Sequence, residues 1–170
     1  TLILTGTNSQ SGLTVNQGLV IVSGSGQTGS GGNTTLNAGT VSGLSMGNVL
    51  RLDNSGTASG SRIGSTRTLT LNAAGFELIG NGSTAVAETN NANLTLNSGF
   101  NLLTLSQVSS GSLLFSGTSI TRANQATGLV RGVVLSGGSA GMTFSSAITA
   151  IGQAGANNTI SRAIVPWLLV

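Results

Sequence analysis

The chain has no cysteine, no histidine, no tyrosine and no lysine among its 170 residues. Without histidine there is no imidazole base, no catalytic triad and no histidine metal ligand. Without cysteine there is no thiol nucleophile, no disulfide framework and no thiolate metal site. Without lysine there is no Schiff base. The sequence therefore predicts no catalytic, cofactor-binding or metal-binding residue, and a protein that is not an enzyme.

Charge and aromatic side chains are also scarce, at 5% and 3% of the residues. Surface helices need many charged residues on their solvent face, so a helical fold is excluded. Disorder is excluded as well, because 38% of the residues are hydrophobic and the mean hydropathy is +0.32. The composition is dominated by Gly, Ser, Thr, Asn, Leu and Val, which is typical of strands and tight turns.

The net charge of +3 does not predict a nucleic-acid partner, because the arginines are scattered and few aromatic residues lie among them. Six arginines occur, at positions 51, 62, 67, 122, 131 and 162. The apolar run from Ala163 to Val170 is too short to span a bilayer, so no membrane-spanning segment is expected in this chain.

A short motif recurs along the chain. It consists of an apolar–polar–apolar run, an asparagine, a glycine two or three residues later, and often a second alternating run. The copies include "LTVNQGLVIV", "TLNAG", "LTLNAAGFEL" and "LTLNSGFNL". The predicted structural turn positions are Asn16, Gly18, Asn37, Gly39, Asn72, Gly75, Asn97 and Gly99.

Alternation puts one face of each strand in a core and the other in water. Asn and Gly tolerate positive φ, so the chain can bend there and begin a second strand against the same core. Stacked at about 4.8 Å, such units form a parallel β-helix of roughly seven to eight coils, in which asparagines at equivalent bends can stack into a ladder. An antiparallel β-sandwich is the alternative, but it does not explain why the same bend residues recur in one phase.

Residues 1–24, "TLILTGTNSQSGLTVNQGLVIVSG", resemble the autotransporter-associated β-strand repeat of bacterial surface proteins. The positions that match its pattern are Leu2, Leu4, Gly6, Asn8, Gly12, Thr14, Val15, Gly18, Leu19 and Ile21. Residues 49–100 look like the longer repeat blocks of such proteins, whereas residues 105–163 match in composition only. The resemblance implies a secreted or surface-displayed right-handed β-helix that serves as a stalk or adhesive passenger, with no catalytic residues.

Two features of the sequence are compatible with chemistry at first sight. Asp53, Glu77 and Glu88 are the only carboxylates, and a glycosidase needs two of them across a cleft. The simpler interpretation is that Glu77 alternates outward between two core residues and that Asp53 belongs to a turn. Residues 24–29 fit G-x-G-x-x-G, but "SGGNTTLNAG" follows instead of the helix that a dinucleotide fingerprint requires.

We expect one β-helical module over residues 1–170, a piece of a longer protein, with its clearest repeats in 1–104 and more divergent coils in 105–170. Its expected role is that of a stalk, scaffold or fibre outside the cell or on its surface. Partners are expected to be further copies at the open coil ends, or a glycan or surface ligand. Adhesion through outward Thr, Asn and Ser rows is the alternative function. Ice binding by Thr rows is disfavoured because most coils lack T-x-T.

Overall fold

A computed structural model of the protein describes residues 1–39, 46–132, 140–146 and 166–169, with the side chains of residues 90–92 excepted. The strands are β1 (Leu2–Leu4), β2 (Leu13–Val15), β3 (Gly18–Val22), β4 (Thr34–Leu36), β5 (Asn48–Asp53), β6 (Leu69–Asn72), β7 (Gly75–Ile79), β8 (Val86–Ser98), β9 (Phe100–Ser106), β10 (Leu113–Arg122), β11 (Thr127–Gly132), β12 (Ala140–Phe144) and β13 (Leu168–Leu169).

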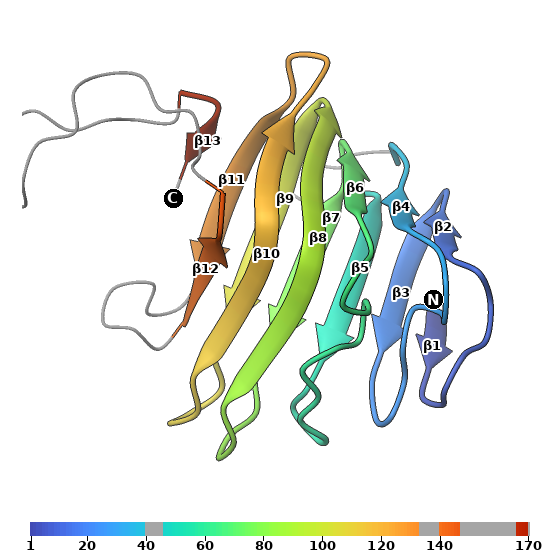
Figure 1. Ribbon diagram of the computed structural model, residues 1–170, viewed down its shortest axis with the longest axis vertical. Coiled ribbons are helices and arrows are strands. Elements are labelled where there is room, and N and C mark those ends of the chain that lie inside the picture. The colour runs from blue at the N-terminus through green and yellow to red at the C-terminus, as the bar shows by residue number, and fades with distance from the viewer. Residues whose placement is uncertain (40–45, 133–139, 147–165, 170) are drawn as a thin grey trace, which may run out of the picture.

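Within the described ranges the strands form two sheets, and every strand pair is parallel. The odd-numbered strands make a seven-stranded sheet in the order β1-β3-β5-β7-β9-β11-β13, and the even-numbered strands make a six-stranded sheet from β2 to β12. In Figure 1 the even strands run upward in front and the odd strands run downward behind while the chain advances sideways, which is a right-handed coil. The predicted all-β parallel β-helix is confirmed, and the antiparallel sandwich is excluded.

The core lies between the two sheets and is made by the predicted alternation. On β5 and β7, Leu50, Leu52, Phe76 and Leu78 point inward and are fully buried, while the residues between them face outward. Complete burial of such a side chain contributes about 1.5–3 kcal/mol. The Phe76 and Phe115 rings meet edge to face across the core at 5.5 Å between centroids.

The number of coils is slightly lower than the seven to eight predicted, because several coils are longer than expected. Leu50 pairs with Phe76, Phe76 with Leu103 and Leu103 with Val130, so successive coils take 26, 27 and 27 residues. The additional residues of these coils lie in loops that do not contain the asparagine–glycine motif. The sheets continue past residue 104 through β10, β11 and β12, and β13 pairs with β11.

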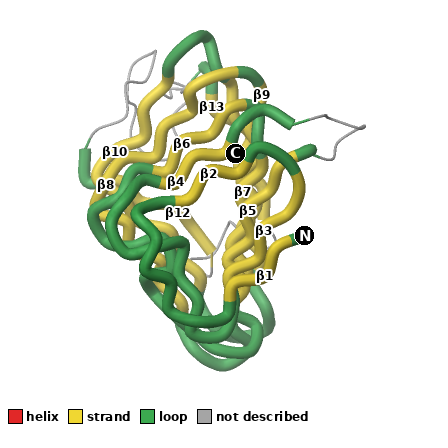
Figure 2. The backbone as a smooth tube through the Cα atoms, turned by 90° about the vertical axis from the view of Figure 1, so that its right-hand side faces the viewer, coloured by secondary structure: helices red, strands yellow, loops and turns green. Residues whose placement is uncertain are grey.

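The coil has two different corners, visible in Figure 2, which looks at the molecule turned by 90° from Figure 1. The asparagine corner is the bend from each even strand to the next odd strand, around residues 16, 37, 72, 97 and 124. The loop corner contains the connections from odd to even strands, which among the described residues are 5–12, 23–33, 54–68, 80–85 and 107–112. The predicted apolar end of the chain is described only at residues 166–169; the remainder of 163–170 lies outside the described residues.

Candidate functional site

The predicted bend asparagines lie in one row at the asparagine corner. Asn37 Nδ2 donates to Asn16 Oδ1 at 2.7 Å, Asn72 Nδ2 to Asn37 Oδ1 at 3.2 Å, and Asn97 Nδ2 to Asn72 Oδ1 at 2.6 Å. Asn124 continues the row by donating to Asn97 Oδ1 at 3.2 Å. The row therefore links five coils, and sequence separations of 21, 35 and 25 residues become contacts between neighbours.

Two of the four predicted glycines take the left-handed backbone that the bend requires. Gly18 has φ 97° and Gly99 has φ 60°, and both lie immediately before an odd strand or at its start. In the third coil Ala73, with φ 46°, makes the bend instead of Gly75.

At Gly39 and Gly75 a side chain would lie too close to neighbouring atoms, and neither residue has a left-handed φ. A Cβ on Gly75 would lie 3.1 Å from Val49 Cγ2, and a Cβ on Gly39 would lie 2.7 Å from the Gly47 carbonyl carbon.

Two buried asparagines that the sequence patterns did not reveal complete this corner. Asn48 Oδ1 accepts from the Gly18 amide at 2.7 Å, and Asn48 Nδ2 donates to the carbonyls of Asn16 and Asn37. Asn101 Oδ1 accepts from the Ala74 amide at 3.2 Å and its Nδ2 donates to carbonyls of its own and the next coil. Both satisfy backbone groups that the bend takes out of the ladder. A polar residue at an inward position at the start of an apolar strand was the available signal.

The loop corner is held by a buried charged cluster. The fully buried Arg62 donates from Nε to Asn54 Oδ1 at 2.9 Å, from Nη1 to the Gly26 carbonyl at 3.0 Å and from Nη2 to the Thr57 carbonyl at 2.8 Å. The carboxylate of Glu88, also fully buried, accepts from the amides of Arg62 and Ile63, each at 2.9 Å. The cluster connects three successive coils.

Burial raises the pKa of Glu88 above its ordinary 4.5, although the two amide donors and the Arg62 charge oppose the shift. Burial likewise lowers the pKa of Arg62, against the charges of Glu88 and Asp53. The two side chains bond backbone groups and Asn54 inside the corner, so the cluster holds neighbouring coils together.

The three carboxylates do not form an acid pair. Glu77 lies on β7, faces outward as predicted, and pairs with Arg51 at 2.7 Å between Glu77 Oε2 and Arg51 Nε. Glu88 lies on β8 in the other sheet. Partial burial of Asp53 would raise its pKa, but hydrogen bonds from the hydroxyl and amide of Ser55 outweigh it, so the pKa falls below 3.8.

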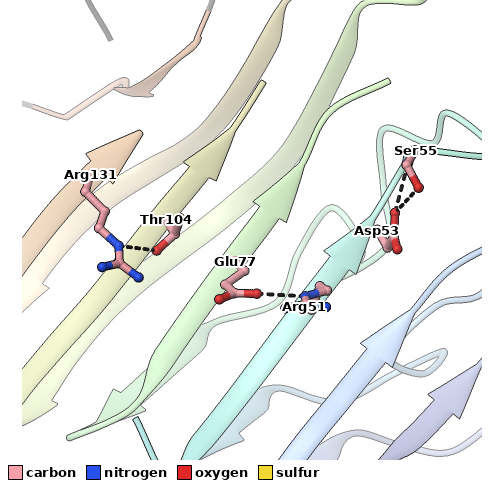
Figure 3. A network of polar contacts seen from close by, with 6 residues as sticks. All are labelled: Arg51, Asp53, Ser55, Glu77, Thr104 and Arg131. Carbon is pink, nitrogen blue, oxygen red and sulfur yellow. Dashed lines mark hydrogen bonds and ion pairs between the residues drawn. The ribbon is translucent and has the colours of Figure 1, made fainter. Parts of the chain in front are cut away.

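The outer face of the odd sheet carries a charged row. Arg51, Glu77, Thr104 and Arg131 are register partners on β5, β7, β9 and β11 (Figure 3). Arg131 Nε donates to Thr104 Oγ1 at 3.1 Å. Beside the row lies a hollow of about 330 Å³, bordered by Glu77, Thr104 and Arg131 and floored by Met46, Val49, Gly75 and Leu102.

The outer face of the even sheet carries a threonine row. Its members are register partners from coil to coil: Thr14, Thr35, Thr70, Thr95 and Thr121. The hydroxyls of Thr95 and Thr121 lie 3.0 Å apart and share a hydrogen bond. With the asparagine row two residues further on, this face presents uncharged amides and hydroxyls.

The G-x-G-x-x-G segment lies in the loop between β3 and β4, and a strand follows it. Its glycines serve close packing against the first coil: a Cβ on Gly26 would lie 2.2 Å from the Leu4 carbonyl oxygen.

No cluster of three or more metal-ligating side chains occurs within the described ranges. The described part of the chain also contains no helix that could cross a bilayer.

Comparison with known proteins finds no family model, no curated protein and no solved structure that matches the chain. The resemblance to autotransporter-associated repeats therefore stays a prediction that depends on the residues quoted above.

Proposed function

We propose that this chain is a non-enzymatic rod module, a stalk, scaffold or fibre segment of an extracellular or cell-surface bacterial β-helical protein. The observation that carries the proposal is the unbroken stacking of coils, in which two parallel sheets and the row of five corner asparagines run through successive coils. Parallel ladders of this kind resist extension because each coil is bonded to both neighbours.

The state of the carboxylates supports a role without catalysis. Glu88 accepts hydrogen bonds from two backbone amides, Glu77 forms an ion pair with Arg51, and Asp53 accepts a hydrogen bond from Ser55. General acid–base chemistry needs a proton donor or acceptor aimed at a substrate, and these groups are aimed at the protein itself.

Stacking can extend beyond one chain. The first coil leaves Leu2 and Ile3 on β1 50% and 58% exposed, so a coil of the same spacing can cover them. We propose that neighbouring modules or copies join end to end in this way.

Electron microscopy of the purified chain tests the rod and its assembly. We expect rods with an axial repeat near 4.8 Å, the spacing of stacked strands. Compact particles without that repeat would contradict the proposal. Turnover of a polysaccharide that is lost in Glu77→Gln would overturn the non-enzymatic role.

A second candidate function is adhesion through the uncharged face of the even sheet. The specific observation is that the hydroxyls of Thr14, Thr35 and Thr70, on three successive even strands, make no hydrogen bond to the described protein. Binding to immobilised neutral glycans that is lost in a Thr14, Thr35 and Thr70 to Val triple variant would favour this candidate over a passive stalk.

A further inference from the structure

The hollow on the odd sheet lies where the chain concentrates its charge. Only nine Arg, Asp and Glu side chains occur in the whole sequence. Three of them, Arg51, Glu77 and Arg131, lie in one row on this face. The row has two positive charges and one negative charge. Because Arg51 already neutralises Glu77, the excess positive charge belongs to Arg131.

The Arg131 side chain is held in place by one hydrogen bond, and other donors of its guanidinium are available to a ligand. Its Nε is held by Thr104 Oγ1, and its two terminal nitrogens make no hydrogen bond to the described residues. A guanidinium with both terminal nitrogens available binds a carboxylate in bidentate fashion. On the other side of Thr104, Glu77 uses Oε2 for Arg51, and its second oxygen is available to accept from a ligand hydroxyl.

The floor of the hollow, beside this row, is apolar. Its floor is formed by Gly75 together with Met46, Val49 and Leu102. Because Gly75 has no side chain, the hollow is deepest there. Side chains from neighbouring strands are spaced at about 4.8 Å, so Glu77 and Arg131 flank a span of roughly 10 Å centred on Thr104. Figure 3 shows Glu77, Thr104 and Arg131 on three neighbouring strands of one face.

We propose that this hollow, the Arg131 hollow, binds a sugar unit of an acidic oligosaccharide, a uronic acid. Its carboxylate pairs with Arg131, a ring hydroxyl donates to Glu77, and the apolar face of the ring lies on Leu102 and Met46. The inference goes beyond the rod role and uses neither the threonine row nor the coil ends.

An acidic peptide is the competing ligand, and the topology disfavours it. Extended peptides gain affinity by adding a strand to an open sheet edge. The hollow lies over β5, β7, β9 and β11, and each of these is paired on both sides, so the strands offer no open edge to a peptide. The ligand must be held by side chains, which suits a ring that carries several hydroxyls.

The test is titration of the full chain with fluorescently labelled hexagalacturonate, with neutral maltohexaose and hexaglutamate as comparison probes. We expect hexagalacturonate to bind and the other two to bind at least tenfold more weakly. Arg131→Ala should weaken binding by about tenfold or more, the loss expected for a charged hydrogen-bonded pair. Arg131→Lys should recover only part of it, because lysine keeps the charge without the fork.

Arg122→Ala, which removes the same charge from β10 in the other sheet, is the matched control and should bind as the native chain does. Circular dichroism of each variant separates lost binding from lost folding, and Glu77→Gln gives a second variant at the site. Failure of hexagalacturonate to bind, equal binding of hexaglutamate, or unchanged binding by folded Arg131→Ala would each overturn the proposal. None of these outcomes affects the rod role, which electron microscopy tests separately.

Discussion

The two corners of the coil solve the same problem with different chemistry. Apart from the connection 37–47 between β4 and β5, the asparagine corner turns the chain in one to four residues, and it joins coils through neutral amides at 2.6–3.2 Å. The loop corner uses connections of up to 15 residues, 54–68, and joins coils through a buried arginine and a buried glutamate. Amides can donate and accept in one repeating direction, so the first solution can be copied indefinitely. The second solution is specific to its coils.

This difference decides where the molecule is sensitive. The asparagine corner contains several similar hydrogen bonds, so the loss of one leaves the others in place. A buried ion cluster depends on every partner, since removing one leaves another charge in a medium that solvates it poorly.

The largest effect is expected at the loop corner. Arg62→Met removes the cation beside Glu88 and leaves the Gly26 and Thr57 carbonyls without their donor. We expect a loss of about 3–5 kcal/mol in the free energy of unfolding, measured in urea. Arg131→Met, at an exposed arginine, is the control and should cost under about 0.5 kcal/mol. Equal losses in both variants would contradict the comparison.

The pH dependence of stability reports the same cluster through Glu88. Its pKa is raised above 4.5 in the folded chain, so the folded state binds the proton more tightly than the unfolded state does. This group's contribution is therefore most favourable below pH 4.5 and decreases as the pH rises through the folded pKa.

Glu88→Gln should abolish that pH dependence. It should also cost about 1–3 kcal/mol, because an amide NH₂ then faces a backbone donor. Denaturant unfolding at pH 4 to 8 checks both expectations. A parallel pH dependence in the two chains would assign the effect to another group.

The asparagine corner should show an intermediate effect that depends on position. Asn72 lies inside the row, donating to Asn37 and accepting from Asn97, whereas the side chain of Asn16, at the first end of the row, has only its bond from Asn37 among those described. Asn72→Ala should cost about 1–3 kcal/mol and Asn16→Ala about half of that, by thermal or urea unfolding. If the terminal variant lost as much as the internal one, the row would not be a cooperative ladder.

The bend itself should show a smaller effect. Gly99 has φ 60°, and a Cβ there would lie 2.8 Å from Ala73 Cβ. Gly99→Ala should cost about 1–2 kcal/mol. Gly6→Ala, at a glycine with open space around it and an ordinary φ, serves as control and should be close to neutral. Thermal unfolding of the two variants gives the comparison, which fails if Gly6→Ala is the more destabilised.

The smallest effect belongs to the outer face. Arg51 and Glu77 are 35% and 24% exposed, so their pair is screened by water. A double-mutant cycle with Arg51→Ala and Glu77→Gln should give a coupling of about 0–1 kcal/mol that decreases in 1 M salt. A coupling above about 2 kcal/mol would mean that this face, and not only the loop corner, holds the coils together.

The same contrast explains what the sequence can predict. The asparagine corner repeats, so Asn16, Asn37, Asn72 and Asn97 could be aligned by eye and expected to stack. Gly75 was harder, because its neighbour Ala73 takes the positive φ and nothing in "LNAAGFE" distinguishes the two roles. The strands followed from alternation, which is a local property.

The loop corner could not be predicted. Arg62 and Glu88 are 26 residues apart and occur once each, so no repeat marks them as partners. Charged residues are rarely buried unless paired, and Glu88 in "AVAETN" has the pattern of an exposed strand residue. The Arg131 hollow was invisible for the same reason: its side chains come from separate coils, and only the register brings them together.

Pulling one molecule from its two termini tests the rod role most directly. If stacked coils carry load, force–extension curves should show successive ruptures, each releasing one coil of 18 to 30 residues. At 3.3–3.6 Å per residue each step should add roughly 60–110 Å of chain. Extension without ruptures, at the force of an unfolded chain, would contradict the account of this protein as a load-bearing rod.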